Sequence, residues 1–83
     1  MTTSNERRWV IRSAADFGRT IAGLRAERGL TQSELAARTG ISRNYLAQLE
    51  RGVAGLMLER VVRLLRRLGG EITVTLPEQP DDA

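Results

Sequence analysis

The chain has 83 residues, enough for one domain with a modest hydrophobic core. It contains no cysteine and no histidine, which excludes disulfides, the usual zinc sites and catalysis by a thiol or an imidazole. No apolar run approaches the roughly 20 residues of a membrane span, and the N-terminus has no apolar segment long enough for a signal peptide. We therefore expect a cytoplasmic protein that has no cofactor, metal or membrane partner.

Charge is distributed unevenly along the chain. The net charge is +3, and all 13 basic residues are arginines. Residues 13–70 carry ten arginines against five acids, whereas residues 71–83 carry four acids and no base. A basic body with an acidic tail suits a polyanionic partner, although charge alone is equally consistent with an ordinary solvated surface.

The first predicted helix follows a short N-terminal arm. We expect residues 1–12 to form this arm, partly disordered, with the apolar residues 9–11 as either a strand or an anchor. Ser13 is a suitable N-cap, and apolar residues then recur at helical spacing to about Arg28. Gly29 is expected to end the helix.

Two short helices joined by a tight turn come next. Thr31 and Glu34 form a capping box at the start of the second helix. Gly40 supplies a left-handed turn, Ile41 is expected to anchor that turn in the core, and Ser42 caps the third helix. The residues expected to face inward are Leu35, Ala36, Leu46 and Leu49. This pair of helices has the pattern of a helix-turn-helix, which places its second helix in the major groove of duplex DNA.

The fourth predicted helix, over residues 57–68, is apolar on two adjoining stripes. One stripe would suffice to cover a small core, so the surplus needs an explanation. Either a second subunit covers the outer stripe, which is the interpretation we adopt, or this helix lies at the centre of the core with the other three around it. The inner stripe consists of Leu58, Val62 and Leu65, and the outer stripe of Met57, Val61, Leu64 and Leu68.

Residues 71–76 alternate between polar and apolar side chains, which predicts a strand. A single strand in a helical domain needs a partner, either its own copy in a second subunit or residues 9–12. The first alternative, which we adopt, makes this segment a dimerisation strand. Its apolar residues are Ile72, Val74 and Leu76. The chain is thus predicted to be mainly α, with a four-to-five-helix domain over residues 13–70, one C-terminal β-strand and an acidic flexible tail over residues 77–83.

The third helix carries the residues that we expect to read DNA, because the N-terminal turn of a recognition helix lies toward the bases. Arginine can pair with guanine through two hydrogen bonds, whereas asparagine and glutamine suit adenine. The polar residues expected to read bases are Ser42, Arg43, Asn44 and Gln48. Phosphate contacts are expected from Gln32, Arg38, Tyr45 and Arg51. Gln32 begins the second helix, where free backbone N–H groups favour an anion.

The two-helix segment resembles the Cro/C1-type (Xre) helix-turn-helix family over about residues 16–68. The segments that carry the resemblance are Leu30–Ala36, Gly40–Ser42 and Leu49–Gly52. The resemblance implies the same phosphate contact by Gln32 and the same base-reading roles for Arg43, Asn44 and Gln48. It also implies an interior ion pair between Arg25 in the first helix and Glu50 at the end of the third.

A helix-turn-helix domain followed by Leu68–Glu71 and a single strand is also similar to the HipB-like antitoxins. This likeness implies a homodimer joined through its C-terminal strands, which represses its own operon and binds a HipA-like kinase toxin. The chain departs from the Xre pattern before the fourth helix, where Leu56 and Met57 stand in place of the usual polar cap. The resulting apolar patch at residues 53–57 is either a partner site or a repacked loop.

We therefore interpret the chain as a homodimeric repressor that binds an inverted-repeat operator and serves as the autoregulating antitoxin of a type II toxin–antitoxin operon. The toxin would be HipA-like or of another kind. Two alternatives stay open: a stand-alone repressor of the phage or plasmid type, and a protein-interaction module without DNA binding. We do not expect an enzyme, because the sequence offers no nucleophile–base pair and no phosphate-binding glycine loop.

Overall fold

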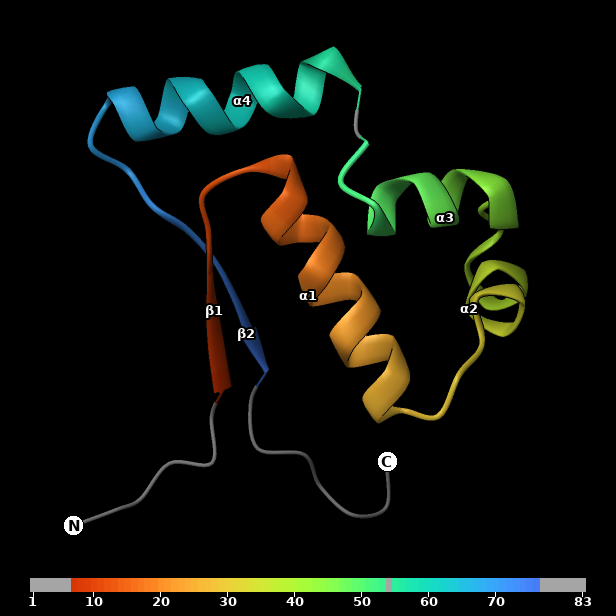
Figure 1. Ribbon diagram of the computed structural model, residues 1–83. Coiled ribbons are helices and arrows are strands. Elements are labelled where there is room, and N and C mark those ends of the chain that lie inside the picture. The colour runs from red at the N-terminus through yellow and green to blue at the C-terminus, as the bar shows by residue number, and fades with distance from the viewer. Residues whose placement is uncertain (1–6, 54, 77–83) are drawn as a thin grey trace, which may run out of the picture.

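The computed structural model of the chain describes residues 7–53 and 55–76. The elements in this part of the chain are β1 (Arg7–Ile11), α1 (Ala14–Glu27), α2 (Gln32–Thr39), α3 (Arg43–Glu50), α4 (Leu56–Arg67) and β2 (Ile72–Leu76). Helix α1 lies between the two-stranded sheet and the α2–α3 pair, and α4 crosses beyond the N-terminal end of α1 (Figure 1). The predicted mainly α, helix-turn-helix fold is confirmed, with four helices in the described residues.

Three helices begin where their capping residues predicted. The side-chain oxygens of Ser13, Thr31 and Ser42 each accept a hydrogen bond from the backbone N–H three residues later. At α2 the Glu34 carboxylate also accepts from the N–H of Thr31 at 2.8 Å, which completes the capping box. Helix α4 has no side-chain cap at its start, and it begins at Leu56, one residue earlier than predicted.

Strand β2 pairs with β1 of the same chain. The antiparallel register places Ile72 opposite Ile11 and Leu76 opposite Arg7. The sequence left two possible partners for β2, a second copy of the same strand or the N-terminal segment, and in the structure β2 pairs with the N-terminal segment. Part of the expected N-terminal arm is therefore a strand. Two features hold β1 in place. The Ile11 side chain is buried, with only 1% of its surface exposed. The Arg7 guanidinium contacts the Glu27 carboxylate of α1 at 2.6 Å. Pairing of β2 with a second copy would have to use its outer edge.

The hydrophobic core is small. Its buried apolar side chains, among the described residues, are Ile11, Ala14, Ala36, Leu46 and Val62. Ile41, in contrast, is 38% exposed, so the prediction that it anchors the turn in the core is wrong. The buried positions between α2 and α3 are taken by Ala36 and Leu46, while Leu35 and Leu49 are half-buried.

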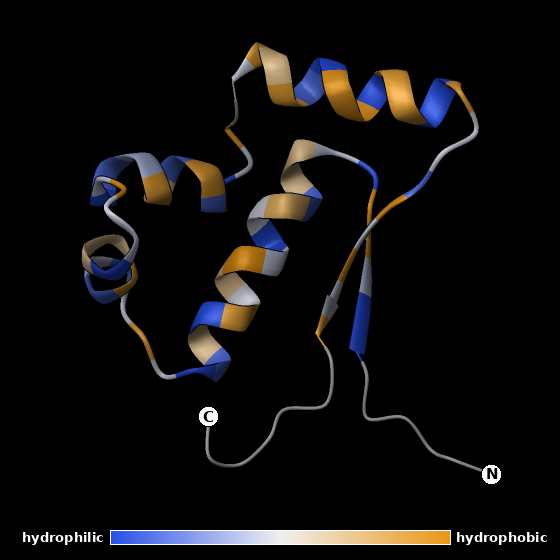
Figure 2. Ribbon diagram, turned by 180° about the vertical axis from the view of Figure 1, so that it is seen from behind, coloured by the Kyte–Doolittle hydropathy of each residue, from blue (hydrophilic) through white to orange (hydrophobic). Residues whose placement is uncertain are grey.

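Helix α4 buries one narrow stripe and exposes the other. Val62 is 3% exposed, whereas Met57 and Leu68 of the outer stripe are 78% and 81% exposed. Leu65, expected on the inner stripe, is also exposed. Because α4 lies at the edge of the molecule, the alternative of a central core helix is wrong (Figure 1). Orange and blue bands alternate along α4 in Figure 2, which reflects its alternation of apolar residues and arginines.

Helices α1 and α3 meet at Gly18, a residue that the sequence analysis did not single out. A Cβ atom at this position would lie 2.3 Å from the carbonyl oxygen of Leu49 and 2.8 Å from that of Glu50. Glycine inside a helix lowers stability relative to alanine by roughly 0.5–1 kcal/mol. Because Gly18 has no side chain, the backbone of α1 can lie directly against the C-terminal end of α3.

Replacing Gly18 with alanine is expected to lower the free energy of unfolding by about 1–3 kcal/mol, because α1 and α3 must separate to admit the methyl group. Urea denaturation measures the change. Gly23→Ala is the matched control in the same helix, since its Cβ would meet nothing within 4 Å. The control should gain up to about 1 kcal/mol from the better helix propensity of alanine. Similar effects from the two substitutions would contradict the close α1–α3 contact.

Candidate nucleic-acid interface

The N-terminal turn of α3 presents free polar side chains. Arg43 and Asn44 are exposed, and neither side chain has a hydrogen bond to another described residue. The Ser42 hydroxyl accepts from the N–H of Tyr45 at 3.1 Å, which leaves its own proton available to donate. Gln48, one turn further along, is half-buried. Three of the four residues predicted to read bases therefore lie together, exposed, at the N-terminal turn of α3.

The residues predicted to contact phosphates differ in the exposure of their side chains and in their hydrogen bonds. Arg38 is exposed in the last turn of α2, and Arg51 is exposed at the C-cap of α3. Tyr45 is also exposed, at 51%. Gln32 is half-buried, and its side-chain amide donates a hydrogen bond to a Glu50 carboxylate oxygen at 2.9 Å. That amide retains a second N–H and the start of α2 retains unpaired backbone donors, so an anion can still be bound there.

An ion pair between Arg25 and Glu50 fixes these helices relative to one another. Arg25 donates from Nε and Nη2 to the two Glu50 carboxylate oxygens at 2.7 and 2.9 Å. Its Nη1 donates to the carbonyl oxygen of Leu30, also at 2.9 Å. With the bond from Gln32, the network joins α1, the loop before α2, the first residue of α2 and the last residue of α3.

The electrostatics of this pair are those of a partly buried contact. The Glu50 side chain is only 6% exposed, and the hydrogen bond from Arg25 lowers its pKa below the usual value. The same bond raises the pKa of Arg25. Each shift favours the charged form, so the pair is fully ionised near neutral pH. The Arg25–Glu50 pairing was inferred from a family resemblance, whereas the addition of Gln32 and Leu30 was not foreseen, since no local spacing connects them with Glu50.

The residues predicted to join two subunits lie on two other elements. Met57, Val61, Leu64 and Leu68 run along the exposed side of α4. In β2, Ile72, Val74 and Leu76 are half-buried and alternate with exposed threonines. Both sets lie outside α2 and α3, so a partner could cover them without covering the N-terminal turn of α3 (Figure 1).

A family model described as helix-turn-helix matches residues 21–74, which include the whole of α2, α3 and α4. The chain belongs to the Cro/C1-type helix-turn-helix family. Membership makes this Cro/C1-type protein a DNA-binding transcription regulator, with α2 and α3 as its helix-turn-helix.

Two curated relatives, both from Sinorhizobium fredii (strain NBRC 101917 / NGR234), carry similar names. The uncharacterized HTH-type transcriptional regulator y4dJ is 44% identical over 52 residues, which are 63% of this chain and 68% of the relative. The uncharacterized HTH-type transcriptional regulator y4mF is 31% identical over 67 residues, which are 81% of this chain and 88% of the relative. No solved structure matches the chain.

Within the described part of this Cro/C1-type protein, no three histidine, cysteine, aspartate or glutamate residues gather closely enough to hold a metal ion. Among its helices, none is both long and apolar enough to cross a membrane.

The Arg25–Glu50 pair predicts a specific pH dependence of stability. Because the pKa of Glu50 is lower in the folded chain than in the unfolded chain, the pair stabilises the fold above the unfolded value of about 4.3. This stabilisation is lost as the pH falls through the lowered folded pKa. Glu50→Gln should therefore cost about 2 kcal/mol at pH 7 and progressively less below pH 4.5, measured by urea denaturation across this range.

The matched control is Glu71→Gln, which removes an exposed carboxylate just before β2. This variant should differ little from the original chain at pH 7. If the stability difference between Glu50→Gln and the original chain stays constant from pH 7 to pH 3, the ion pair is not the source of the stabilisation.

Proposed function

We propose that the chain is a homodimeric repressor that reads an inverted-repeat operator with α3 and serves as the autoregulating antitoxin of a type II toxin–antitoxin operon. The observation that carries the DNA-reading part is the exposed N-terminal turn of α3, which the Arg25–Glu50 network and Gly18 position on the body of the domain. Apolar or acidic residues at this turn would have favoured a protein-interaction module, whereas the turn carries Ser42, Arg43 and Asn44.

Each polar residue of α3 has a proposed role. Arg43 is suited to a bidentate contact with guanine, and Asn44 and Gln48 to adenine, while the Ser42 hydroxyl can donate to a base acceptor. Phosphate contacts by Gln32, Arg38, Tyr45 and Arg51 would set the register of the helix in the groove. These contacts release counterions, so binding should weaken steeply as salt rises.

The proposed second subunit is supported by the apolar surface that one chain leaves uncovered. The outer stripe of α4 follows the four-three-four spacing of a helix that packs along another helix. The outer edge of the β1–β2 sheet offers a further place for a second copy. A two-fold dimer would present two α3 helices to successive major grooves, roughly 34–36 Å apart.

The antitoxin role is the more specific part of the proposal, and it rests on the likeness to HipB-like proteins. Exposed apolar residues before and at the start of α4, namely Val53, Leu56 and Met57, offer a surface for a HipA-like or other toxin. The acidic segment 77–83 lies outside the described residues and is a second candidate contact. The alternative is a stand-alone repressor of the phage or plasmid type, whose neighbouring gene would not arrest growth when expressed without this one.

Arg43→Ala is expected to reduce the preference for the operator over scrambled DNA by about 1–3 kcal/mol, since one bidentate base contact is lost. Gel-shift titrations with the upstream promoter fragment at two salt concentrations measure this preference. Arg19→Ala is the matched control: it removes the same charge from an exposed position on α1, where Arg19 pairs with Asp16 beside β1. Unchanged selectivity in Arg43→Ala would show that Arg43 does not read a base.

Leu64→Gln should weaken the dimer at least tenfold, because it places a polar amide in the middle of the outer stripe. Leu64 is 63% exposed in the single chain, so the substitution removes little of the packing within the chain. Sedimentation equilibrium gives the dimer dissociation constant, and Arg60→Gln on the same helix is the control. If Leu64→Gln dimerises as well as the control, the outer stripe is not the subunit interface.

A further inference from the structure

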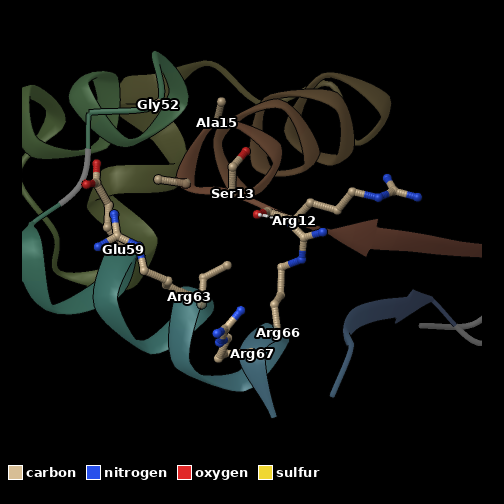
Figure 3. Close-up of a pocket in the computed structure, with 10 residues that line it drawn as sticks. Arg12, Ser13, Ala15, Gly52, Glu59, Arg63, Arg66 and Arg67 are labelled. Carbon is tan, nitrogen blue, oxygen red and sulfur yellow. Dashed lines mark hydrogen bonds between the residues drawn. The ribbon is translucent and has the colours of Figure 1, made fainter. Parts of the chain in front are cut away.

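An open cleft of about 620 Å³ lies between the start of α1 and the C-terminal half of α4 (Figure 3). Its floor includes the buried side chain of Val62 and the first residues of α1. Its rim carries four arginines and one acid: Arg12, Arg63, Arg66, Arg67 and Glu59. The cleft therefore combines a small apolar floor with a strongly cationic rim.

The rim arginines differ from several arginines elsewhere in the domain. Arg7, Arg19 and Arg25 are each paired with a carboxylate. The four rim arginines form no ion pair within the described residues, and Arg66 makes only a 3.5 Å hydrogen bond to the carbonyl oxygen of Arg12. The cleft therefore offers guanidinium groups that no carboxylate neutralises within the described residues (Figure 3). Guanidinium groups bind phosphate and carboxylate through paired hydrogen bonds.

The position and size of the cleft favour a small molecule over duplex DNA. The C-terminal half of α4 lies on the side of the β1–β2 sheet, away from α2 and α3 (Figure 1). DNA bound along the N-terminal turn of α3 would thus be remote from the rim arginines. Ligand pockets typically measure roughly 300–1,000 Å³ and bury an apolar part of the ligand beside a few polar groups, and this cleft lies within that range.

We propose that the cleft binds a phosphorylated small molecule of about nucleotide size. Its phosphates would contact the rim arginines, and its compact apolar part would lie on the floor near Val62. The ligand would join α4 to the start of α1 and to Gly52, which follows α3. Because α4 carries the outer stripe, occupancy would also regulate dimerisation, and this regulatory part alone rests on the proposed function.

Isothermal titration calorimetry without DNA tests the site independently of the proposed function. The probes are ATP, inorganic pyrophosphate and adenosine, added without divalent metal at constant ionic strength. ATP is expected to bind more tightly than pyrophosphate, and adenosine much more weakly than either. The double variant Arg63→Gln/Arg66→Gln should weaken ATP binding at least tenfold. The matched control, Arg60→Gln, lies on the same helix outside the cleft and should stay within twofold of the original chain.

Glu59→Gln gives an opposite effect that a damaged fold cannot imitate. It removes the one acid that lines the cleft among the described residues, and it should tighten ATP binding at least twofold. The proposal is overturned if neither ATP nor pyrophosphate binds, if Arg60→Gln loses as much affinity as the double variant, or if Glu59→Gln weakens binding. It is also overturned if pyrophosphate does not bind while the double variant reduces the salt dependence of DNA binding, because the rim arginines would then contact the DNA backbone.

Discussion

The geometry of the helix-turn-helix depends on the contact between Arg25 and Glu50. One guanidinium joins α1 to the end of α3 and to the loop before α2, and Gln32 adds the start of α2. A buried ion pair contributes little net stability compared with apolar residues of similar volume, but losing one partner is costly. The network fixes the relative positions of α1, α2 and α3, because Arg25 and Gln32 converge on one carboxylate at the end of α3.

This polar network lies beside a small apolar core. Around the helix-turn-helix, Ala36, Leu46 and the close approach at Gly18 complete the packing. Helix α4 and the sheet are attached mainly through Val62, Ile11 and Ala14. The helix-turn-helix is therefore braced internally, whereas α4, which carries the exposed apolar stripe, packs on the domain through few residues.

Features with local causes were predictable from the sequence. The helix starts at Ser13, Thr31 and Ser42 followed from caps that act over three residues, and the exposed turn of α3 followed from its position after the third cap. The partner of β2 was not determined by its own sequence, because either candidate strand would satisfy its backbone groups. Apolar character likewise did not reveal that Ile41 is left exposed.

The contacts that escaped prediction join residues distant in sequence. Gly18 lies against Leu49 and Glu50 only after three helices have been placed, and Gln32 meets Glu50 for the same reason. Nothing in the spacing of these residues signals the contact. The rim of the cleft is similar, since Arg12 comes from the segment before α1 and the other three arginines from α4. From the sequence alone, these four arginines could not be distinguished from the other arginines of the chain.

The register of the sheet also determines where the chain enters and leaves the folded domain. Arg7 lies opposite Leu76, so the first and last described residues are neighbours at the end of the sheet that is farther from α4 (Figure 1). The chain therefore enters and leaves the described part of the fold at one corner, which α1 separates from α2 and α3 (Figure 1). A fluorophore attached at Leu76 would therefore lie across α1 from α3, away from a DNA duplex bound at the N-terminal turn of α3.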